Sequence, residues 1–280
     1  MPFTLSHAAA VLPALRRRGD ARGSLVACAL IAGSFAPDAT YFLDSLVTGA
    51  MAFGAFTHSL PGLLTVDVLI TGVLVGLWLL VREPVVALLP PAWQPRWGSL
   101  VRGEHWRRRP PLLLAAWFSL SSVLGSLSHA GWDAFTHPHR WGTEAFPSLM
   151  RPLAGLPTYT YVQYGSSAVA LGVLTWFTVR ALRATETGPA TAPLLGRRQR
   201  RWVLVALAGC AVAGAVHRCA RWYGYVGEIE TPLDILPTAC FGAGAGLTTG
   251  VLLYAMAVRI GRRKSGDRPS RKGSVPVPSQ

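Results

Sequence analysis

Long apolar runs separated by shorter polar stretches make up most of the chain. A transmembrane helix needs about 20 mostly apolar residues, and several runs approach or reach that length. The six candidate segments are residues 24–43, 60–81, 112 into the stretch SHAGWDAFTHPH (128–139), 162–182, 202–216 and 236–260. Pro37 and Asp38 interrupt the first of them. The pattern predicts an all-α, polytopic membrane helix bundle with about six transmembrane helices.

The composition supports this prediction. A soluble domain usually carries about 25% charged residues, whereas this chain carries 14% and is 51% hydrophobic. The net charge of +14 would suggest nucleic-acid binding in a soluble protein. Here the basic residues lie between the apolar runs, so membrane topology explains them better. We therefore expect the lipid bilayer, and no nucleic acid, as the partner.

The basic residues alternate from loop to loop. With six spans, 23 of the 27 Lys and Arg fall on one side of the membrane and 4 on the other. Because cytoplasmic loops are enriched in Lys and Arg, we expect the arginine cluster at residues 16–18 and the C-terminus in the cytoplasm. Residues 1–260 should form one integral membrane domain. Residues 261–280 are rich in Ser, Pro and basic residues, which predicts a disordered cytoplasmic tail.

Polar residues collect on the side opposite the basic loops. Asp38 lies near the end of the first segment, His58 at the start of the second, and His129, Asp133 and His137 at the end of the third. The last three, spaced four residues apart, would share one face of a helix. Imidazole and carboxylate are the usual ligands of a zinc-like ion, and ionisable groups at membrane depth indicate a functional site. A His-x3-Asp pair alone is weak evidence, because most such pairs cap a helix or form hydrogen bonds.

The other polar residues receive simpler interpretations. Pro138 disfavours helix at the residue before it, so the third helix should end at His137. His139, beyond the proline, is expected to be solvated, and His217 to lie at the membrane interface. Asp67 lies inside the second segment and is assigned no role.

The chain contains four short motifs in this order: MPFTLSHAAAVLP, GSFAPDATYFL, FTHSLPGLL and LSHAGWDAFTH. They resemble the DUF4184 family of uncharacterised bacterial membrane proteins, and the likeness covers residues 1–182. The same order of His, Pro-Asp, Thr-His-Ser and His-x3-Asp resembles the YdjM-type inner-membrane proteins regarded as metal-dependent hydrolases. More distantly, it is similar to zinc-dependent phospholipase C, an all-helical enzyme with a zinc cluster.

The resemblance implies a divalent metal, with zinc the first choice, bound as one or two ions in a protein of the bacterial inner membrane. The implied ligands are His7, Asp38, His58, His129 and Asp133, with His137 as a further candidate. Asp133 and Asp38 are also the candidates for a catalytic general base, since a carboxylate suits either role. No later His-x3-Glu follows, so a complete three-metal cluster is not expected.

His7 poses a geometric question, because the arginines that follow it are expected in the cytoplasm and the other candidates on the opposite side. At about 1.5 Å per residue of helix, the nine residues from His7 to Arg16 span about 14 Å, and the fifteen from Gly23 to Asp38 about 22 Å. If residues 3–15 re-enter the membrane as a half-helix, His7 comes within about 10 Å of the depth of Asp38. The site would then be sunk below the outer surface. If residues 3–15 lie flat on the cytoplasmic face, His7 cannot be a ligand.

The function that these residues favour is metal-dependent hydrolysis of a phosphoester in a lipid or a lipid-linked compound. The alternative is a non-catalytic multi-pass membrane protein whose His and Asp residues form hydrogen bonds between helices. Such a protein would be structural or partner-binding, or less plausibly a transporter, for which the intramembrane Asp67 and the broken first segment would be suited.

Overall fold

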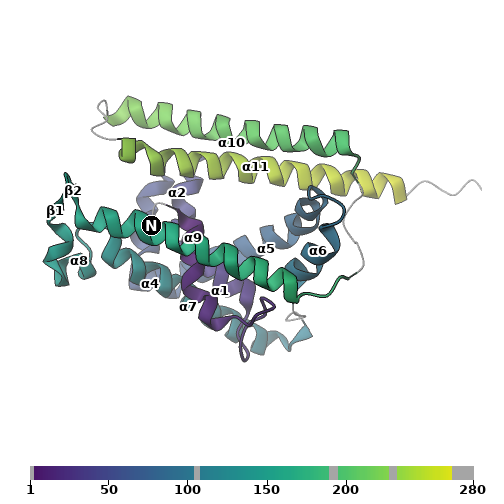
Figure 1. Ribbon diagram of the computed structural model, residues 1–280, viewed down its shortest axis with the longest axis horizontal. Helices are drawn as coiled ribbons and strands as arrows, with labels where there is room; N and C mark the ends of the chain where they lie inside the picture. Colours follow the sequence, from purple (N-terminus) through teal and green to yellow (C-terminus); the bar gives the residue numbers. More distant parts are fainter. Residues whose placement is uncertain (1–2, 104–107, 189–194, 227–231, 267–280) are drawn as a thin grey trace, which may run out of the picture.

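The computed structural model describes residues 3–103, 108–188, 195–226 and 232–266 of the 280-residue chain (Figure 1). Nearly all regular structure in these residues is helical. The only strands among them are β1 (Pro152–Leu153) and β2 (Leu156–Pro157), which pair as a small antiparallel hairpin. The predicted all-α helical bundle is therefore confirmed.

Five helices of the described residues are long and apolar enough to cross a membrane. They are α5 (Val66–Ala87), α7 (Pro111–Thr136), α9 (Thr158–Ala184), α10 (Arg197–Val226) and α11 (Pro232–Gly266). The last five of the six predicted segments fall on these helices. α7 begins with Pro111, a residue whose fixed φ suits the first helical position, and ends at Thr136 with His137 as its C-cap. The predicted end of this helix before Pro138 is thus observed.

The first predicted span is wrong. Residues 24–43 form α1 (Ala27–Gly33), the 3₁₀ turn η2 (Ala36–Asp38) and α2 (Ala39–Leu43), none of which is long enough to cross a membrane. Pro37 lacks the amide hydrogen that an α-helix needs and its ring crowds the preceding turn. The Ser34 hydroxyl also donates to the Ile31 carbonyl (2.7 Å) at the point where α1 ends. The chain bends there and places Asp38, 4% exposed, inside the bundle.

The second predicted span begins later and ends later than expected. Residues 60–64 form the separate helix α4 (Leu60–Leu64), and Thr65, with φ −124° and ψ −81°, breaks the helix before α5 continues to Ala87. The remaining short elements are η3 (Ala50–Phe53), α3 (Gly54–Thr57), α6 (Gln94–Arg102), α8 (Trp141–Ala145) and η5 (Pro147–Met150). The short helices before α5 fold together around the end of α7 and form the walls of the site described below.

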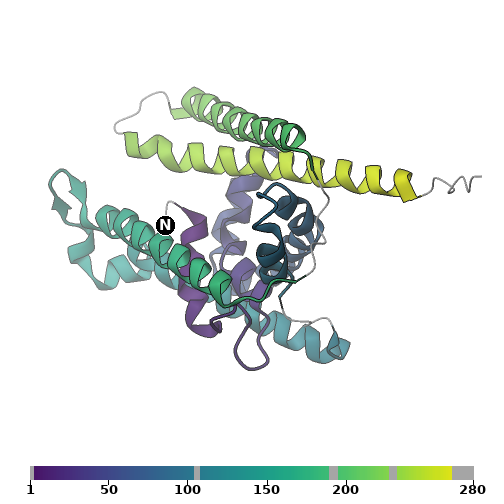
Figure 2. The ribbon, with the colours of Figure 1, turned by 45° about the vertical axis from the view of Figure 1, so that its right-hand side comes forward.

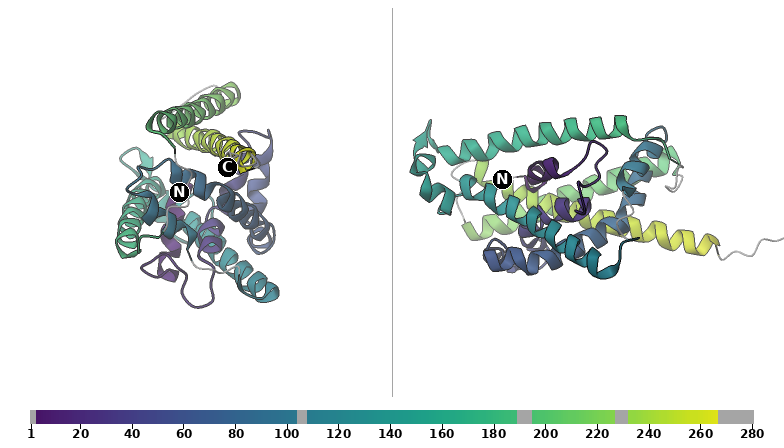
Figure 3. Two further views of the ribbon diagram at one scale, coloured as in Figure 1. Left: turned by 90° about the vertical axis from the view of Figure 1, so that its right-hand side faces the viewer. Right: turned by 90° about the horizontal axis from the view of Figure 1, so that it is seen from below.

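The N-terminal segment re-enters the bundle. It forms the 3₁₀ helix η1 (Thr4–Ala14), which lies against α7 and α9 (Figure 3). Leu15 then pairs with Ala21 in a β-bridge, so the chain reverses at the arginine cluster and returns as α1. Val11, Leu15, Ala21 and Leu30 form the apolar core of this hairpin. A 3₁₀ helix rises about 2.0 Å per residue, so η1 reaches further toward the depth of Asp38 than an α-helix of equal length.

α10 and α11 form an antiparallel hairpin along one side of the molecule (Figures 1 and 2). The two helices approach so closely that a Cβ at Gly242 would collide with the carbonyl oxygen of Gly214, as expected where small residues line a membrane helix pair. The hairpin is joined to the rest of the bundle through Arg218, whose guanidinium lies 3.3 Å from the Asp44 carboxylate just after α2.

The basic loops gather at one end of the bundle. Arg109 donates to the Ser24 carbonyl, Arg200 to the Leu89 carbonyl (3.3 Å) and Arg259 to the Leu80 carbonyl (2.6 Å). The helix α11 continues to Gly266, so the disordered tail does not begin at residue 261 as predicted. The helix extends because Arg and Lys, which follow the apolar run, are good helix formers. The remainder of the predicted tail, residues 267–280, lies outside the described residues.

Candidate metal centre

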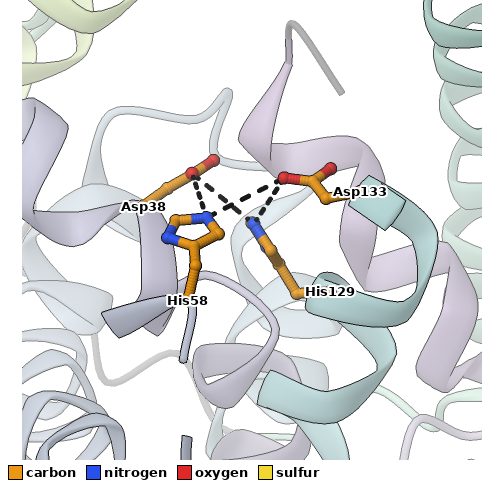
Figure 4. Close-up of side chains that lie close together, drawn as sticks. All are labelled: Asp38, His58, His129 and Asp133. Carbon is orange, nitrogen blue, oxygen red and sulfur yellow. Dashed lines mark ion pairs between the residues drawn. The ribbon is translucent and has the colours of Figure 1, made fainter. Parts of the chain in front are cut away.

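Four side chains with metal-ligand chemistry converge at the end of the bundle opposite the basic loops (Figure 4). Asp38 ends η2, His58 follows α3, and His129 and Asp133 lie one turn apart near the end of α7. One ligand atom from each lies within 4.8 Å of the others. The structure thus brings together residues that are up to 95 positions apart in the sequence.

The distances suit a single ion. Nε2 of His129 lies 3.5 Å from Oδ1 of Asp38 and 3.3 Å from Oδ2 of Asp133. Nε2 of His58 lies 3.5 Å from Oδ1 of Asp38 and 3.8 Å from Oδ2 of Asp133. Tetrahedral zinc with ligand bonds of about 2.0–2.2 Å separates neighbouring ligand atoms by roughly 3.4 Å. The four residues therefore fit a tetrahedral ion without rearrangement of the backbone.

The cluster is buried below the end of α7. His129 is 0% exposed and Asp133 6% exposed. At about 1.5 Å per residue, these two side chains start roughly 5 to 10 Å before the last residue of the helix, Thr136. The centre is therefore sunk into the bundle.

Backbone carbonyls orient both imidazoles of the group. Nδ1 of His58 lies 2.9 Å from the Gly54 carbonyl oxygen, and Nδ1 of His129 lies 2.8 Å from the Ser34 carbonyl oxygen. A carbonyl can only accept, so each Nδ1 carries the proton and donates it. In the neutral rings Nε2 is then a bare lone pair aimed at the carboxylates. Acceptors that face one another at this distance repel unless a proton or a metal cation lies between them.

His7 joins this group from η1. Its ring stacks on His129 with centroids 3.7 Å apart and an interplanar angle of 16°, and its Nε2 lies 3.5 Å from Oδ1 of Asp133. Neither ring nitrogen has a hydrogen-bond partner among the described residues, although the side chain is fully buried. Burial, assisted by His129, lowers the pKa of His7 well below its usual value. The ring is therefore neutral at pH 7, the form in which imidazole binds a metal.

Hydroxyl groups hold Asp38 in place. The Thr4 hydroxyl donates to Oδ2 of Asp38 (2.5 Å), and the Thr57 hydroxyl donates to the Pro37 carbonyl (2.7 Å). Burial alone would raise the pKa of Asp38, but positive charge on the His129 ring and hydrogen bonds from His129 and His58 outweigh it and hold this pKa well below its usual range. The carboxylate is therefore ionised, and its fixed orientation is typical of the supporting contacts around metal ligands.

His137 lies at the rim of the centre. Its Nδ1 is 3.5 Å from Oδ1 of Asp133, but its Nε2 is 3.2 Å from the side-chain amide nitrogen of Gln163 on α9. Burial lowers the pKa of His137, so this imidazole too is neutral. With its side chain 35% exposed and outside the group of four, it is placed to support Asp133 more directly than to bind the same ion.

The remaining candidates lie outside the group of four. His139 is exposed, with a left-handed backbone (φ 56°), and His217 is exposed on α10. Asp67 is fully buried in the first turn of α5, and neither of its carboxylate oxygens has a hydrogen-bond partner among the described residues.

Tyr41 is a neighbour of the site that sequence reasoning missed. Its ring stacks on His58 with centroids 5.6 Å apart, and a Cβ at Gly54 would collide with it. Burial and the nearby Asp38 raise the pKa of Tyr41, so its hydroxyl remains a proton donor. The available signal was its position three residues after Asp38, which places both on one side of a helical turn.

A helical bundle with membrane-length spans and a buried His and Asp centre defines a multi-pass membrane protein. Comparison with known families agrees with this class. The family described as "Domain of unknown function (DUF4184)" matches residues 1–256, and the chain belongs to this family. The match extends well beyond the four motifs and includes most of α11. No curated protein and no solved structure matches the chain.

Proposed function

We propose that this protein is a metal-dependent hydrolase of phosphoesters in a lipid or a lipid-linked compound. One observation carries the proposal: imidazole Nε2 atoms and carboxylate oxygens converge inside a largely apolar bundle, at separations that suit a divalent ion. His58, His129, Asp38 and Asp133 would hold the ion, with His7 as a fifth ligand or the first ligand of a second ion. Zinc is the first candidate, because nitrogen and oxygen ligands in a tetrahedral arrangement suit it.

Such an ion supplies Lewis-acid chemistry, since it lowers the pKa of water and polarises a phosphoryl oxygen. The residues of this chain would orient the reactants. Both carboxylates lie near imidazoles, but the two within 3.5 Å of Asp133 Oδ1, His7 and His137, are outside the group of four. Asp133 is therefore better placed than Asp38 to accept a proton from water and pass it to an imidazole. Asp38, fixed by Thr4, is better placed to remain a ligand.

We also propose the orientation in the membrane. The basic loops at one end of the bundle would face the cytoplasm of a bacterial cell, by the positive-inside rule. The metal centre would then lie near the outer face of the inner membrane. Contacts at one end of the bundle support this orientation. They bring together the chain near the arginine cluster (residues 16–18), α6 and the end of α9.

Metal analysis of the purified protein is the first test. Wild type is expected to hold zinc, manganese or iron in stoichiometric amount after purification in detergent, and His58→Ala and Asp133→Ala are expected to lose it. The matched control is His217→Ala, which removes an exposed imidazole outside the centre and should keep the metal. The proposal would be wrong if purified wild type contained no metal, or if the metal content of the two site variants equalled that of wild type.

Turnover of phosphoester substrates distinguishes a hydrolase from a structural protein or a transporter. Metal-loaded wild type in nanodiscs is expected to release phosphate or a phosphoalcohol from phosphoester substrates, and Asp133→Ala to lose this activity. A fully loaded protein that hydrolyses neither phosphomonoesters, phosphodiesters nor phospholipids would favour a structural or transport role. Asp67, an unpaired carboxylate inside α5, is the residue that a transport role would use.

A further inference from the structure

A cavity leads from the metal centre to the outside of the bundle. It has a volume of about 320 Å³ and lies between α4, the last turns of α7 and the start of α8. His58 and Asp133 line its inner end. Ligand pockets in proteins typically measure about 300 to 1,000 Å³, so this cavity accommodates a headgroup or a short chain segment but not a whole lipid.

Exposed apolar side chains form part of the cavity wall. Leu60 and Leu127 line it and are 62% and 40% exposed, and Trp141 at its edge is 62% exposed. Leu127 lies nine residues before the end of α7, which is about 13 Å along the helix. At that depth in a membrane protein, exposed leucines contact acyl chains rather than water. The opening is therefore reached from within the lipid layer.

The lining of the cavity includes one arginine, Arg140. Arg140 follows α7 and lines the cavity together with His58 and Asp133. Within the part of the chain that the structure describes, no carboxylate forms an ion pair with its guanidinium. A planar guanidinium binds phosphate through two parallel hydrogen bonds.

We infer that the cavity takes an anionic lipid phosphate directly from the bilayer, with its phosphate between Arg140 and the metal centre and its chain leaving past Leu60 and Leu127. This inference rests on the proposed function for its chemistry. In hydrolysis the oxygen of water bonds to phosphorus, the ester bond between phosphorus and the lipid oxygen breaks, and a proton from water ends on the lipid alcohol. The apolar alcohol can then leave into the bilayer by the route of entry.

Gly131 offers a way to close the cavity without disturbing the fold. It lines the cavity, and a Cβ built there meets no atom within 4 Å. Gly131→Leu would therefore fill the cavity with a side chain that also favours helix. Gly72 on α5 is the matched control, because it is exposed and a Cβ there likewise meets nothing within 4 Å.

Photo-crosslinking in nanodiscs tests the binding without any need for turnover. The probe is phosphatidic acid with a diazirine in one acyl chain, and the readout is the labelled peptide. We expect wild type and Gly72→Leu to be labelled within residues 127–141, and Gly131→Leu to lose most of that labelling. Arg140→Gln should reduce labelling about tenfold, the effect of losing a charged hydrogen bond, but should leave labelling by the matching diacylglycerol probe unchanged. Labelling spread evenly over the exposed helices, or equal labelling by both probes, would overturn the inference.

Two activity measurements separate this inference from the proposed function. Wild type and Gly72→Leu should hydrolyse both the lipid phosphate and a small water-soluble phosphoester. Gly131→Leu should lose hydrolysis of the lipid phosphate with its metal retained, whereas Asp133→Ala should lose both activities together with the metal. Specific labelling without hydrolysis of either substrate would leave the lipid site standing and remove the hydrolase. Unchanged hydrolysis of the lipid phosphate by Gly131→Leu, with the metal retained, would leave the hydrolase standing and remove the lipid cavity.

Discussion

Asp38 and Asp67 are both buried, but their surroundings differ. Asp38 accepts a hydrogen bond from Thr4 and lies 3.5 Å from Nε2 of both His58 and His129. Asp67 is 0% exposed and its oxygens have no partner among the described residues. A buried carboxylate without partners costs several kcal/mol of folding stability unless it is neutralised. Removal of the negative charge should therefore affect the protein differently at the two positions.

Replacement of each aspartate by its uncharged isostere tests this difference. Asp38→Asn should lower metal affinity by more than about tenfold, because it removes a charged ligand. Asp67→Asn should keep the metal and unfold at the same or a higher temperature, because it removes an uncompensated charge. Metal content and thermal unfolding in detergent check both. Equal loss of metal in the two variants would show that the ligand set is wrong.

The buried His7 makes the metal-free protein sensitive to acid. Its pKa in the folded protein lies below the unfolded value, which is about 6.5. The unfolded chain therefore binds a proton more readily, and the stability present above about pH 6.5 should fall as the pH drops, by at most about 1.4 kcal/mol per pH unit for one group. Thermal unfolding of chelator-treated protein between pH 7.5 and 5.5 measures this. His7→Gln should flatten the dependence, and a slope identical to that of wild type would show that other groups cause it.

At the scale of elements, α7 carries two glycines with opposite environments. A Cβ at Gly125 would collide with backbone atoms of Leu30 and Ser34 at the end of α1, whereas one at Gly131 meets open space. Close approach of α1 and α7 also allows the Ser126 hydroxyl to donate to the Gly33 carbonyl (3.1 Å). The contact at Gly125 therefore fixes the distance between Asp38 and His129.

The same substitution at these two positions should have different outcomes. Gly125→Leu should destabilise the protein by about 3 kcal/mol or more, because overpacking forces the backbone apart, and should reduce metal binding. Gly131→Leu should leave unfolding temperature and metal content near those of wild type. The unfolding temperature and the metal content of both variants test this difference. A stable, metal-loaded Gly125→Leu would contradict the close packing of α1 on α7.

Local sequence rules predicted some elements well and others poorly. The end of α7 at His137 followed from the steric effect of Pro138, which acts on its immediate neighbour. The break at Thr65 depends on tertiary packing, because the residues around it are apolar enough for one continuous helix. The division of residues 24–43 has a local cause in Pro37, but the local rule does not tell that the chain turns back there. The stacking of Tyr41 on His58 depends on Gly54, a residue that only the folded chain brings to the tyrosine.

For the whole molecule, the metal candidates were predictable because their order and topology placed them on one side, and the family resemblance joined them into one set. The sunken position of the centre and the approach of His7 followed from helix rise and the positive-inside rule. The count of spans was not predictable in this way. Charge alternation tells which side a loop occupies but does not distinguish a spanning helix from a hairpin such as η1 and α1, which enters and returns.

Cysteine labelling tests the orientation of the whole protein. In a variant without its native cysteines, Arg17→Cys should react with a membrane-impermeant maleimide only from the cytoplasmic side, and His139→Cys only from the outer side. Both native side chains are exposed, so accessibility does not limit the reaction. Labelling of both from the same side would exclude the proposed orientation, and reversed labelling would place the metal centre at the cytoplasmic face.

The hairpin of η1 and α1 has a consequence for biosynthesis. Before α5 emerges from the ribosome, none of the completed helices is long enough to span a bilayer, and η1 carries the buried polar groups Thr4, Ser6 and His7. Backbone and side-chain polar groups of this kind cannot remain among acyl chains without protein partners. Their main partners are α7 and α9, which are translated later. We therefore expect the first quarter of the chain to stay at the translocon or the membrane surface and to enter the bilayer only after the later helices have been inserted.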